Sequence, residues 1–358
     1  MNKEHTSKLR KFLDSKNITL SPKVYFIDAM GNMALGLFAS LLIATILETL
    51  GSWTHWAFLT ESASFAKEAT GAALGVAVAY ALKAPPLVLV SAAAVGYAGN
   101  GLGATYWIDG AELSLTAGPA GAFVAAIIAV ELGKLVSKTT KVDILVTPVV
   151  TILSGVAIAK LACPVIAYLM YMLGSFVNTA TELQPFVMGI IVSVVVGMVL
   201  TLPISSAALC AMIGITGLAG GAATAGCCAQ MIGFAVISFR ENRWSGLVAQ
   251  GLGTSMLQMG NICRRPAIWL PPTLASAICG PVATVLFQLE CTGVAAGMGT
   301  CGLVGPLGII SAMPEGGAMM WAGILLVCFI LPAVLSLLFD AFFRKIGWIR
   351  DGDMKLEL

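Results

Sequence analysis

The sequence predicts an all-α polytopic membrane protein with about ten transmembrane helices plus re-entrant hairpins. The chain has 358 residues, of which 58% are hydrophobic and only 11% are charged. A soluble domain is usually about 25% charged. Apolar blocks long enough to span a bilayer, about 20 residues each, follow one another from near Asp28 to Asp340. Short polar or basic segments separate these blocks, as expected for loops between membrane spans.

Composition divides the chain into three parts. Residues 1–28 form a basic leader, with six basic side chains in the first 27 residues. The apolar block that follows has no obvious cleavage site, so we expect a retained first span and not a removed signal peptide. Residues 29–343 are expected to form the transmembrane domain, and residues 344–358 a basic cytoplasmic tail.

The expected spans alternate with turns that proline, glycine and charged residues mark. An aromatic segment after the first span suits an outer interfacial belt, and an acidic outer loop containing Asp109 and Glu112 follows the third. Residues 205–239 are rich in small side chains and are expected to form two short segments that meet at Gly220-Gly221. The expected spans are 29–50, a return to Lys83, 87–103, 118–133, 144–173, 185–203, the segments within 205–239, a span to about 260, 292–311 and 318–340.

Most of the 20 basic residues fall in segments that this map places in the cytoplasm. The positive-inside rule then places both termini in the cytoplasm and makes the number of full crossings even. Ten crossings plus re-entrant segments fit this count, and twelve short crossings remain an alternative because 205–239 and 261–290 are ambiguous. We therefore expect a multi-pass protein of the cell membrane.

Composition excludes several classes of function. The net charge is only +2 and no basic patch carries interleaved aromatic residues, so nucleic acid is not an expected partner. The two histidines, His5 and His55, lie outside the spans, and the nine cysteines form no paired CxxC array. We therefore expect no metal, no cofactor and no catalytic phosphoryl-transfer residue. The GxGxxG pattern at 297–302 has apolar flanks and lacks the strand that a dinucleotide fold requires.

The stretch from Asn178 to Ala208 is the first candidate wall of a solute site. Asn178, Glu182 and Gln184 precede Pro185, and no charge follows Glu182 until Arg240. Polar groups at the mouth of a membrane helix are tolerated where they face a bundle interior or a wet cavity. The alternative is an ordinary helix start with Glu182 in its first turn.

A second candidate wall lies between residues 261 and 292. Asn261 and Arg264 lie in a proline-rich segment, where the guanidinium either binds an anionic group or anchors the span at the membrane surface. Glu290 follows a long uncharged run, with Gln288 and Thr292 beside it. A carboxylate there binds sugar hydroxyls, carries a proton, or forms a structural ion pair.

Three runs resemble the EIIC-like membrane proteins of the phosphotransferase system, in the branch that includes the perfringolysin-regulator type. They are TELQPFVMGIIVSVVVGMVLTLPISSAA at 181–208, GNICRRPAIWLPPTLASAICGPVATVLF at 260–287 and GMGTCGLVGPLG at 297–308. The second run is also similar to a proline-rich stretch of the glucose-superfamily sugar permeases. The chain departs from those permeases at Arg264-Arg265-Pro266, where they more often show Asn-Pro, and it lacks an intramembrane histidine.

The resemblance implies a homodimeric, elevator-type permease embedded in the lipid bilayer, with a sugar site near Glu182 and Glu290. It also implies separate EIIB and EIIA proteins as partners, because this chain carries neither domain. The sequence therefore predicts a permease for a small polar solute, a sugar or sugar derivative, coupled to phosphorylation or no longer coupled. The alternatives are a membrane sensor or regulator that keeps the permease fold, and a proton-coupled carrier that uses Glu290.

Overall fold

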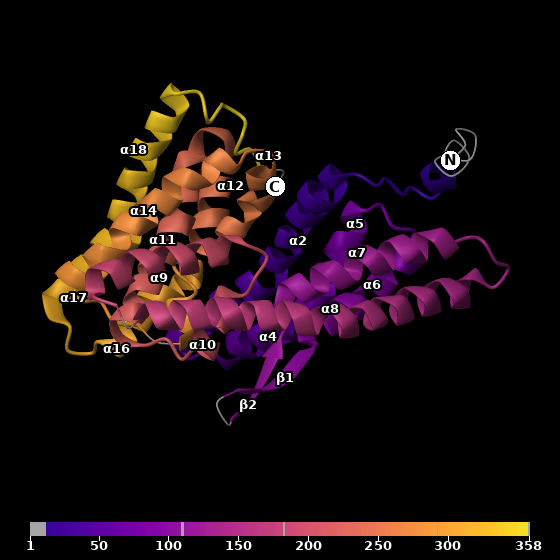
Figure 1. Ribbon diagram of the computed structural model, residues 1–358, viewed down its shortest axis with the longest axis horizontal. Coiled ribbons are helices and arrows are strands. Elements are labelled where there is room, and N and C mark those ends of the chain that lie inside the picture. The colour runs from indigo at the N-terminus through magenta and orange to yellow at the C-terminus, as the bar shows by residue number, and fades with distance from the viewer. Residues whose placement is uncertain (1–11, 109–110, 182, 292, 357–358) are drawn as a thin grey trace. The chain divides into compact units, whose positions relative to one another are not determined.

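The computed structural model describes residues 12–108, 111–181, 183–291 and 293–356. The described chain is built almost entirely of helices (Figure 1). Six of these helices are long and apolar enough to cross a membrane, and shorter apolar helices accompany them. The expectation of an all-α polytopic membrane protein is confirmed. The six span candidates are Val24–Ser52, Gly118–Val136, Asp143–Thr181, Gly217–Ile237, Pro266–Leu286 and Gly317–Lys345.

The chain forms two compact units, and the division does not follow the linear order of the sequence. Unit 1 contains the described residues up to Ser40 together with Ala66–Leu169, and unit 2 contains Leu41–Phe65 together with the described residues from Met170 onward. The elements of unit 1 are η1 (Val24–Ala29), α2 (Met30–Leu37), α5 (Thr70–Ala81), α6 (Pro86–Gly101), β1 (Gly103–Ile108), β2 (Ala111–Thr116), α7 (Gly118–Val136) and most of α8 (Asp143–Thr181).

Unit 2 holds most of the remaining elements. Three helices contain residues of both units: α8, η2 (Phe38–Leu42) and α4 (Ala57–Glu68). The others are α3 (Ile43–Thr54), α9 (Pro185–Thr201), α10 (Ser206–Met212), α11 (Gly217–Ile237), α12 (Phe239–Val248), η3 (Ala249–Gly253), η4 (Ser255–Gln258), α13 (Met259–Arg264), η5 (Pro266–Trp269), α14 (Leu270–Pro281), η6 (Val282–Leu286), α15 (Gly293–Ala296), η7 (Cys301–Leu303), α16 (Val304–Ala312), α17 (Gly317–Leu325), η8 (Leu326–Ile330) and α18 (Leu331–Lys345).

The expected acidic loop after α6 contains a β-hairpin. Strands β1 and β2 pair antiparallel, with Gly103 opposite Thr116 at one end and Ile108 opposite Ala111 at the other. The Tyr106 hydroxyl donates a hydrogen bond of 2.8 Å to the Pro164 carbonyl of α8. This bond ties the hairpin to the helix beside it, whereas Asp109 lies outside the described residues.

Small residues allow the helices of unit 1 to pack closely. A Cβ atom at Gly75 of α5 would stand 2.0 Å from the Ala92 carbonyl oxygen of α6, and one at Gly96 would stand 2.3 Å from the Gly71 carbonyl oxygen. Close packing of this kind contributes to the association of membrane helices, because lipid tails are as apolar as the side chains and leave little hydrophobic driving force. Glycine at these positions is therefore a packing requirement.

Helix α11 is the buried centre of unit 2, and most of its residues are buried inside the protein. Helices α9, α14 and α18 pack against it. A Cβ atom at Gly226 of α11 would stand 1.9 Å from the Ser193 carbonyl oxygen of α9. The Ser193 hydroxyl donates in turn to the Ser276 carbonyl of α14 at 2.8 Å. Three helices therefore meet through backbone contacts and buried hydroxyl bonds.

The small-residue run at 205–239 differs from the sequence expectation. We expected two short segments meeting at Gly220-Gly221, but both glycines lie inside the continuous helix α11. The break comes earlier, between the end of α10 at Met212 and the start of α11 at Gly217. The paired glycines provide room for a neighbouring segment and do not mark a turn.

Candidate functional site

A buried network of uncharged polar side chains lies in unit 2 around Gln230. This glutamine of α11 is fully buried. Its Oε1 accepts hydrogen bonds from Trp269 Nε1 at 3.1 Å and from the Thr201 hydroxyl at 3.3 Å. Its Nε2 donates to the Thr273 hydroxyl at 3.1 Å. The Thr201 hydroxyl is also 2.8 Å from the Ser255 hydroxyl, which extends the network to a fifth residue.

This network exists because the helical path is broken between Ala249 and Trp269. The segment runs through the π-helical η3, the 3₁₀-helical η4, the short α13 and the 3₁₀-helical η5. Thr254 is extended at the first break, and its hydroxyl accepts from the Met256 N–H at 3.1 Å. Arg265 is non-helical at the second break. Irregular backbone at membrane depth is found where it is buried in protein or lines a cavity, and interrupted helices commonly form transporter binding sites.

A second buried network lies beside the first. Gln258 Nε2 donates to Gln250 Oε1 at 3.0 Å, and Asn261 Nδ2 donates to Gln258 Oε1 at 2.8 Å. Gln250 Nε2 donates to the Ser238 hydroxyl at 2.9 Å. Ser255 of the first network and Gln258 of the second are the two ends of η4. The four residues of η4 therefore connect two sets of buried carboxamides and hydroxyls.

The chemistry of these groups suits a polyhydroxylated solute. Carboxamides and hydroxyls both donate and accept hydrogen bonds, as sugar hydroxyls do. Trp269 adds an apolar ring beside the amide of Gln230. Each buried polar group that loses its partner costs about 1–3 kcal/mol, so a solute must replace the hydrogen bonds that it displaces. A ligand with several well-placed hydroxyls meets that demand.

Asn178 and Gln184, two of the predicted site residues, lie at one end of unit 2, which we call the exposed mouth. Asn178 and Gln184 are exposed, and Glu182 lies outside the described residues. Gln184 is the residue before α9, whose first residue is Pro185. The start of this helix is fixed by the Thr284 hydroxyl, which donates to the Pro185 carbonyl at 2.8 Å.

Gln288 and Glu290 follow the same helical turn that holds Pro185. Both side chains are exposed, and Gln288 has a positive φ of 47°. The Glu290 backbone N–H lies 3.2 Å from Met313 Sδ, while Thr292 lies outside the described residues. The bond between Thr284 and Pro185 thus joins the two predicted walls at the segments that carry Gln184 and Gln288.

Asn261 and Arg264 lie at the other end of the same span. Asn261 is buried within the second polar network, and Arg264 is exposed at the end of α13. The helix Pro266–Leu286 has 21 residues and separates them from Gln288. At 1.5 Å per residue this helix is about 30 Å long. The structure therefore divides the six described residues among the eight predicted ones between two ends of unit 2 and does not gather them in one place.

Sequence reasoning missed Gln230, Gln250 and Gln258. Gln230 is the only carboxamide in a helix otherwise made of small and apolar residues, and a lone carboxamide at membrane depth is a usable signal. Gln250 and Gln258 are eight residues apart, and no regular period brings them together. They meet because the helix breaks at Thr254 between them.

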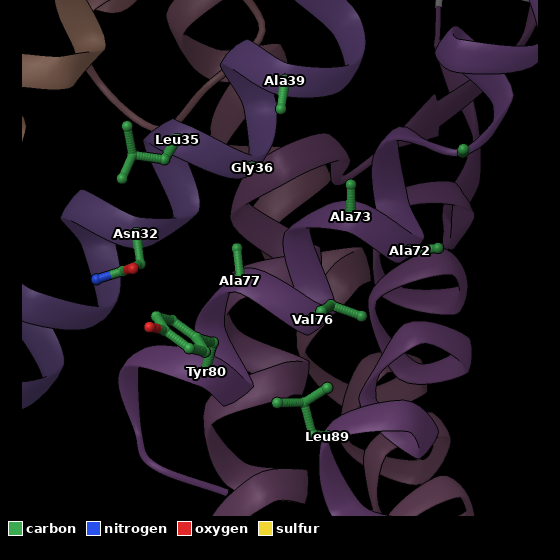
Figure 2. Close-up of a pocket in the computed structure, with 11 residues that line it drawn as sticks. Asn32, Leu35, Gly36, Ala39, Ala72, Ala73, Val76, Ala77, Tyr80 and Leu89 are labelled. Carbon is green, nitrogen blue, oxygen red and sulfur yellow. The ribbon is translucent and has the colours of Figure 1, made fainter. Parts of the chain in front are cut away.

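A separate groove lies in unit 1, between α2 and α5 (Figure 2). Its volume is about 590 Å³, and its walls are mainly alanine, leucine and valine side chains. Asn32 and Tyr80 are the lining residues with polar side-chain groups. The Asn32 amide donates a hydrogen bond of 2.9 Å to the Asp28 carbonyl. None of the predicted site residues that the structure describes lines this groove. An apolar surface of this kind suits an acyl chain and not a sugar.

Residues 27–356 match the family model described as "Phosphotransferase system, EIIC". The match covers both compact units and both buried networks. Neither a curated protein nor a solved structure shows a significant match.

Proposed function

Because this chain belongs to the EIIC family of the phosphotransferase system, whose members are sugar-transporting membrane permease subunits, we propose that it binds an uncharged sugar or sugar derivative in unit 2. The binding groups are the carboxamides and hydroxyls that meet where the helix breaks between Ala249 and Trp269. The observation that carries this proposal is the fully buried Gln230, which bonds to three partners from two other spans, Thr201 of α9 and Trp269 and Thr273 of the helix Pro266–Leu286.

The predicted residues at the opposite mouth have a second role in this proposal. Gln184, Gln288 and Glu290 are exposed, so they suit the capture or release of a solute better than its tight enclosure. Enclosure requires groups removed from water, as Gln230 and Ser255 are. The same solute then meets hydroxyl-binding groups at both ends of the span.

The family also supports a set of partners and an orientation. We include separate EIIB and EIIA proteins, a homodimer and the cytoplasmic membrane in the proposal. The orientation is supported by the basic side chains that gather near the C-terminal segment, because positive charge favours the cytoplasmic face. Arg265 and Arg344 both form ion pairs with acidic residues of that segment.

A thermal-shift experiment on the purified full-length protein tests the site. The probes are glucose, N-acetylglucosamine, maltose and sorbitol, with glucuronate as the acidic comparison. A ligand that binds only the folded state raises the apparent melting temperature. Gln230→Met removes the amide and keeps the side-chain length, whereas Gln184→Met makes the same change at the exposed mouth.

We expect one neutral probe to stabilise wild type and Gln184→Met but not Gln230→Met, each compared with its own baseline. If the shift survives in Gln230→Met and disappears in Gln184→Met, the enclosed site is at the other mouth. A response to glucuronate alone would overturn the assignment of an uncharged substrate.

A further inference from the structure

The C-terminal segment Arg350–Leu356 packs against the broken helical region of unit 2. Its apolar anchor is Met354, which is fully buried, and the preceding Ile349 is only 2% exposed. The Trp348 ring stacks on Phe343 of α18 at a centroid distance of 5.5 Å. The chain therefore turns back on itself after α18 and is held in place by buried side chains.

Two neighbouring side chains of α12 bind the backbone of this segment. Glu241 accepts from the Gly352 N–H at 3.0 Å and from the Met354 N–H at 2.8 Å, one at each carboxylate oxygen. Asn242 donates to the Met354 carbonyl and accepts from the Leu356 N–H, both at 2.8 Å. Hydrogen bonds that backbone N–H groups donate to a carboxylate are stronger than those between neutral groups.

The same segment completes the second buried network. Gln258 Nε2 donates to the Met354 carbonyl at 3.0 Å, and Asn261 Nδ2 donates to the Lys355 carbonyl at 3.0 Å. Asn242, Gln258 and Asn261 are all buried. Backbone carbonyls of the segment thus accept the hydrogen bonds that the Gln258 and Asn261 side chains could otherwise donate to a solute hydroxyl.

Charged pairs surround these backbone contacts. Arg344 Nη1 lies 2.6 Å from Asp351 Oδ1, and Arg265 Nε lies 3.6 Å from Asp353 Oδ2. Asp351 is largely exposed, and exposed ion pairs contribute at most about 1 kcal/mol each. The exposed ion pairs therefore hold the segment only weakly, whereas the buried hydrogen bonds to its backbone determine where it binds.

We propose that residues 350–356 form a clasp that closes the buried polar networks at the end of unit 2 that carries Arg264 and Arg265, and that the clasp must leave before a solute passes this end. The gate is a peptide-binding site, made by Glu241, Asn242, Gln258 and Asn261, whose ligand is the protein's own tail. The closing role rests on the proposed function, because it concerns the path of the solute. The attachment itself rests on the contacts alone.

The test measures access to η4 with a thiol reagent and requires no sugar. Ser255 is fully buried and connects the two networks, so Ser255→Cys reports entry. Cys263 is exposed whereas the other eight cysteines are buried, so the background variant is Cys263→Ser. The probe is a methanethiosulfonate with a trimethylammonium head, applied to protein in nanodiscs, with peptide mapping to identify the modified cysteine.

Four proteins are compared in this background. The first keeps the natural tail, the second ends at Ile349, the third carries Met354→Ala, and the fourth carries Ser245→Ala, an exposed position of the same helix as Asn242. We expect Ser255→Cys to react at least about tenfold faster when the tail is cut or its anchor removed. We expect Ser245→Ala to leave the rate unchanged.

Equal rates in all four proteins would overturn the clasp. Met354→Ala alters the tail alone, so it keeps the test valid if the truncated chain does not fold. Suppose that Ser255→Cys reacts faster without the tail, and that the sugar raises the melting temperature of Gln230→Met as much as that of wild type. The clasp would then be supported and the proposed binding site rejected. The two proposals therefore fail separately.

Discussion

A Cβ atom at Gly221 would stand 1.8 Å from the carbonyl oxygen of Leu289. Gly220 is equally restricted, since a Cβ atom there would stand 2.0 Å from the Cys291 carbonyl oxygen. Two backbone bonds run alongside these contacts, from the Cys291 N–H to the Gly217 carbonyl at 3.2 Å and from the Gly293 N–H to the Ile215 carbonyl at 2.9 Å. The start of α11 thereby fixes the segment that carries Glu290.

Gly221→Ala is expected to displace this segment. The added methyl group meets backbone, which cannot rotate away, and overpacking of this kind typically costs about 1–3 kcal/mol. We expect a clearly lower apparent melting temperature in detergent. Gly31→Ala is the matched control, because a Cβ atom there has no neighbour within 4 Å and alanine favours a helix. A Gly221→Ala protein as stable as wild type would contradict the close approach.

The sequence allowed the membrane class and several helix ends to be predicted, because their causes are local. Pro185 begins α9 as expected, since proline suits the first helical position and lacks only a donor that is unused there. The long uncharged blocks predicted the spans for the same reason: their composition alone fits hydrocarbon. The family resemblance, stated from three runs, is confirmed by the match over residues 27–356.

The arrangement of the site could not be predicted, because it depends on contacts between distant residues. Asn261 and Glu290 were placed in one wall because both lie in the segment 261–292. A helix of 21 residues separates the segments that bear them. The role of the tail was also not predicted, since its partners Asn242 and Asn261 precede it by 112 and 94 residues.

The buried ion pair of unit 1 provides an independent test of that unit. Lys134 is 1% exposed and lies 3.2 Å from Glu131, which also accepts a bond of 3.2 Å from the Tyr25 hydroxyl. Removing one partner of a buried pair usually costs about 3–5 kcal/mol, because the other charge is left uncompensated. We expect Glu131→Gln and Lys134→Met each to lower the melting temperature strongly. The double variant should lose less stability than the sum of the losses in the two single variants. Fully additive losses would show that the two side chains are not coupled.

Glu290→Gln tests the role of the exposed mouth. The carboxylate is exposed and lies outside the buried networks, so we expect the fold and the sugar shift of the thermal assay to survive while the rate of uptake falls. Proteoliposome uptake of the same probe, measured with and without a pH gradient, separates capture from proton coupling. Uptake that follows the gradient in wild type and loses this dependence in Glu290→Gln would favour the proton-coupled carrier.

Arg243→Gly is expected to stabilise the protein. Arg243 has φ 51° and ψ −149°, a conformation almost restricted to glycine, and such strain costs about 1–3 kcal/mol. Its side chain is exposed, but it directly follows Asn242, which holds the Met354 carbonyl. Glycine should relieve the strain and raise the melting temperature, whereas Arg243→Ala removes the same side chain and keeps the strain.

If the strain also holds Asn242 toward the tail, Arg243→Gly will speed modification of Ser255→Cys even as stability rises. A parallel rise with Arg243→Ala would instead assign the effect to the lost charge.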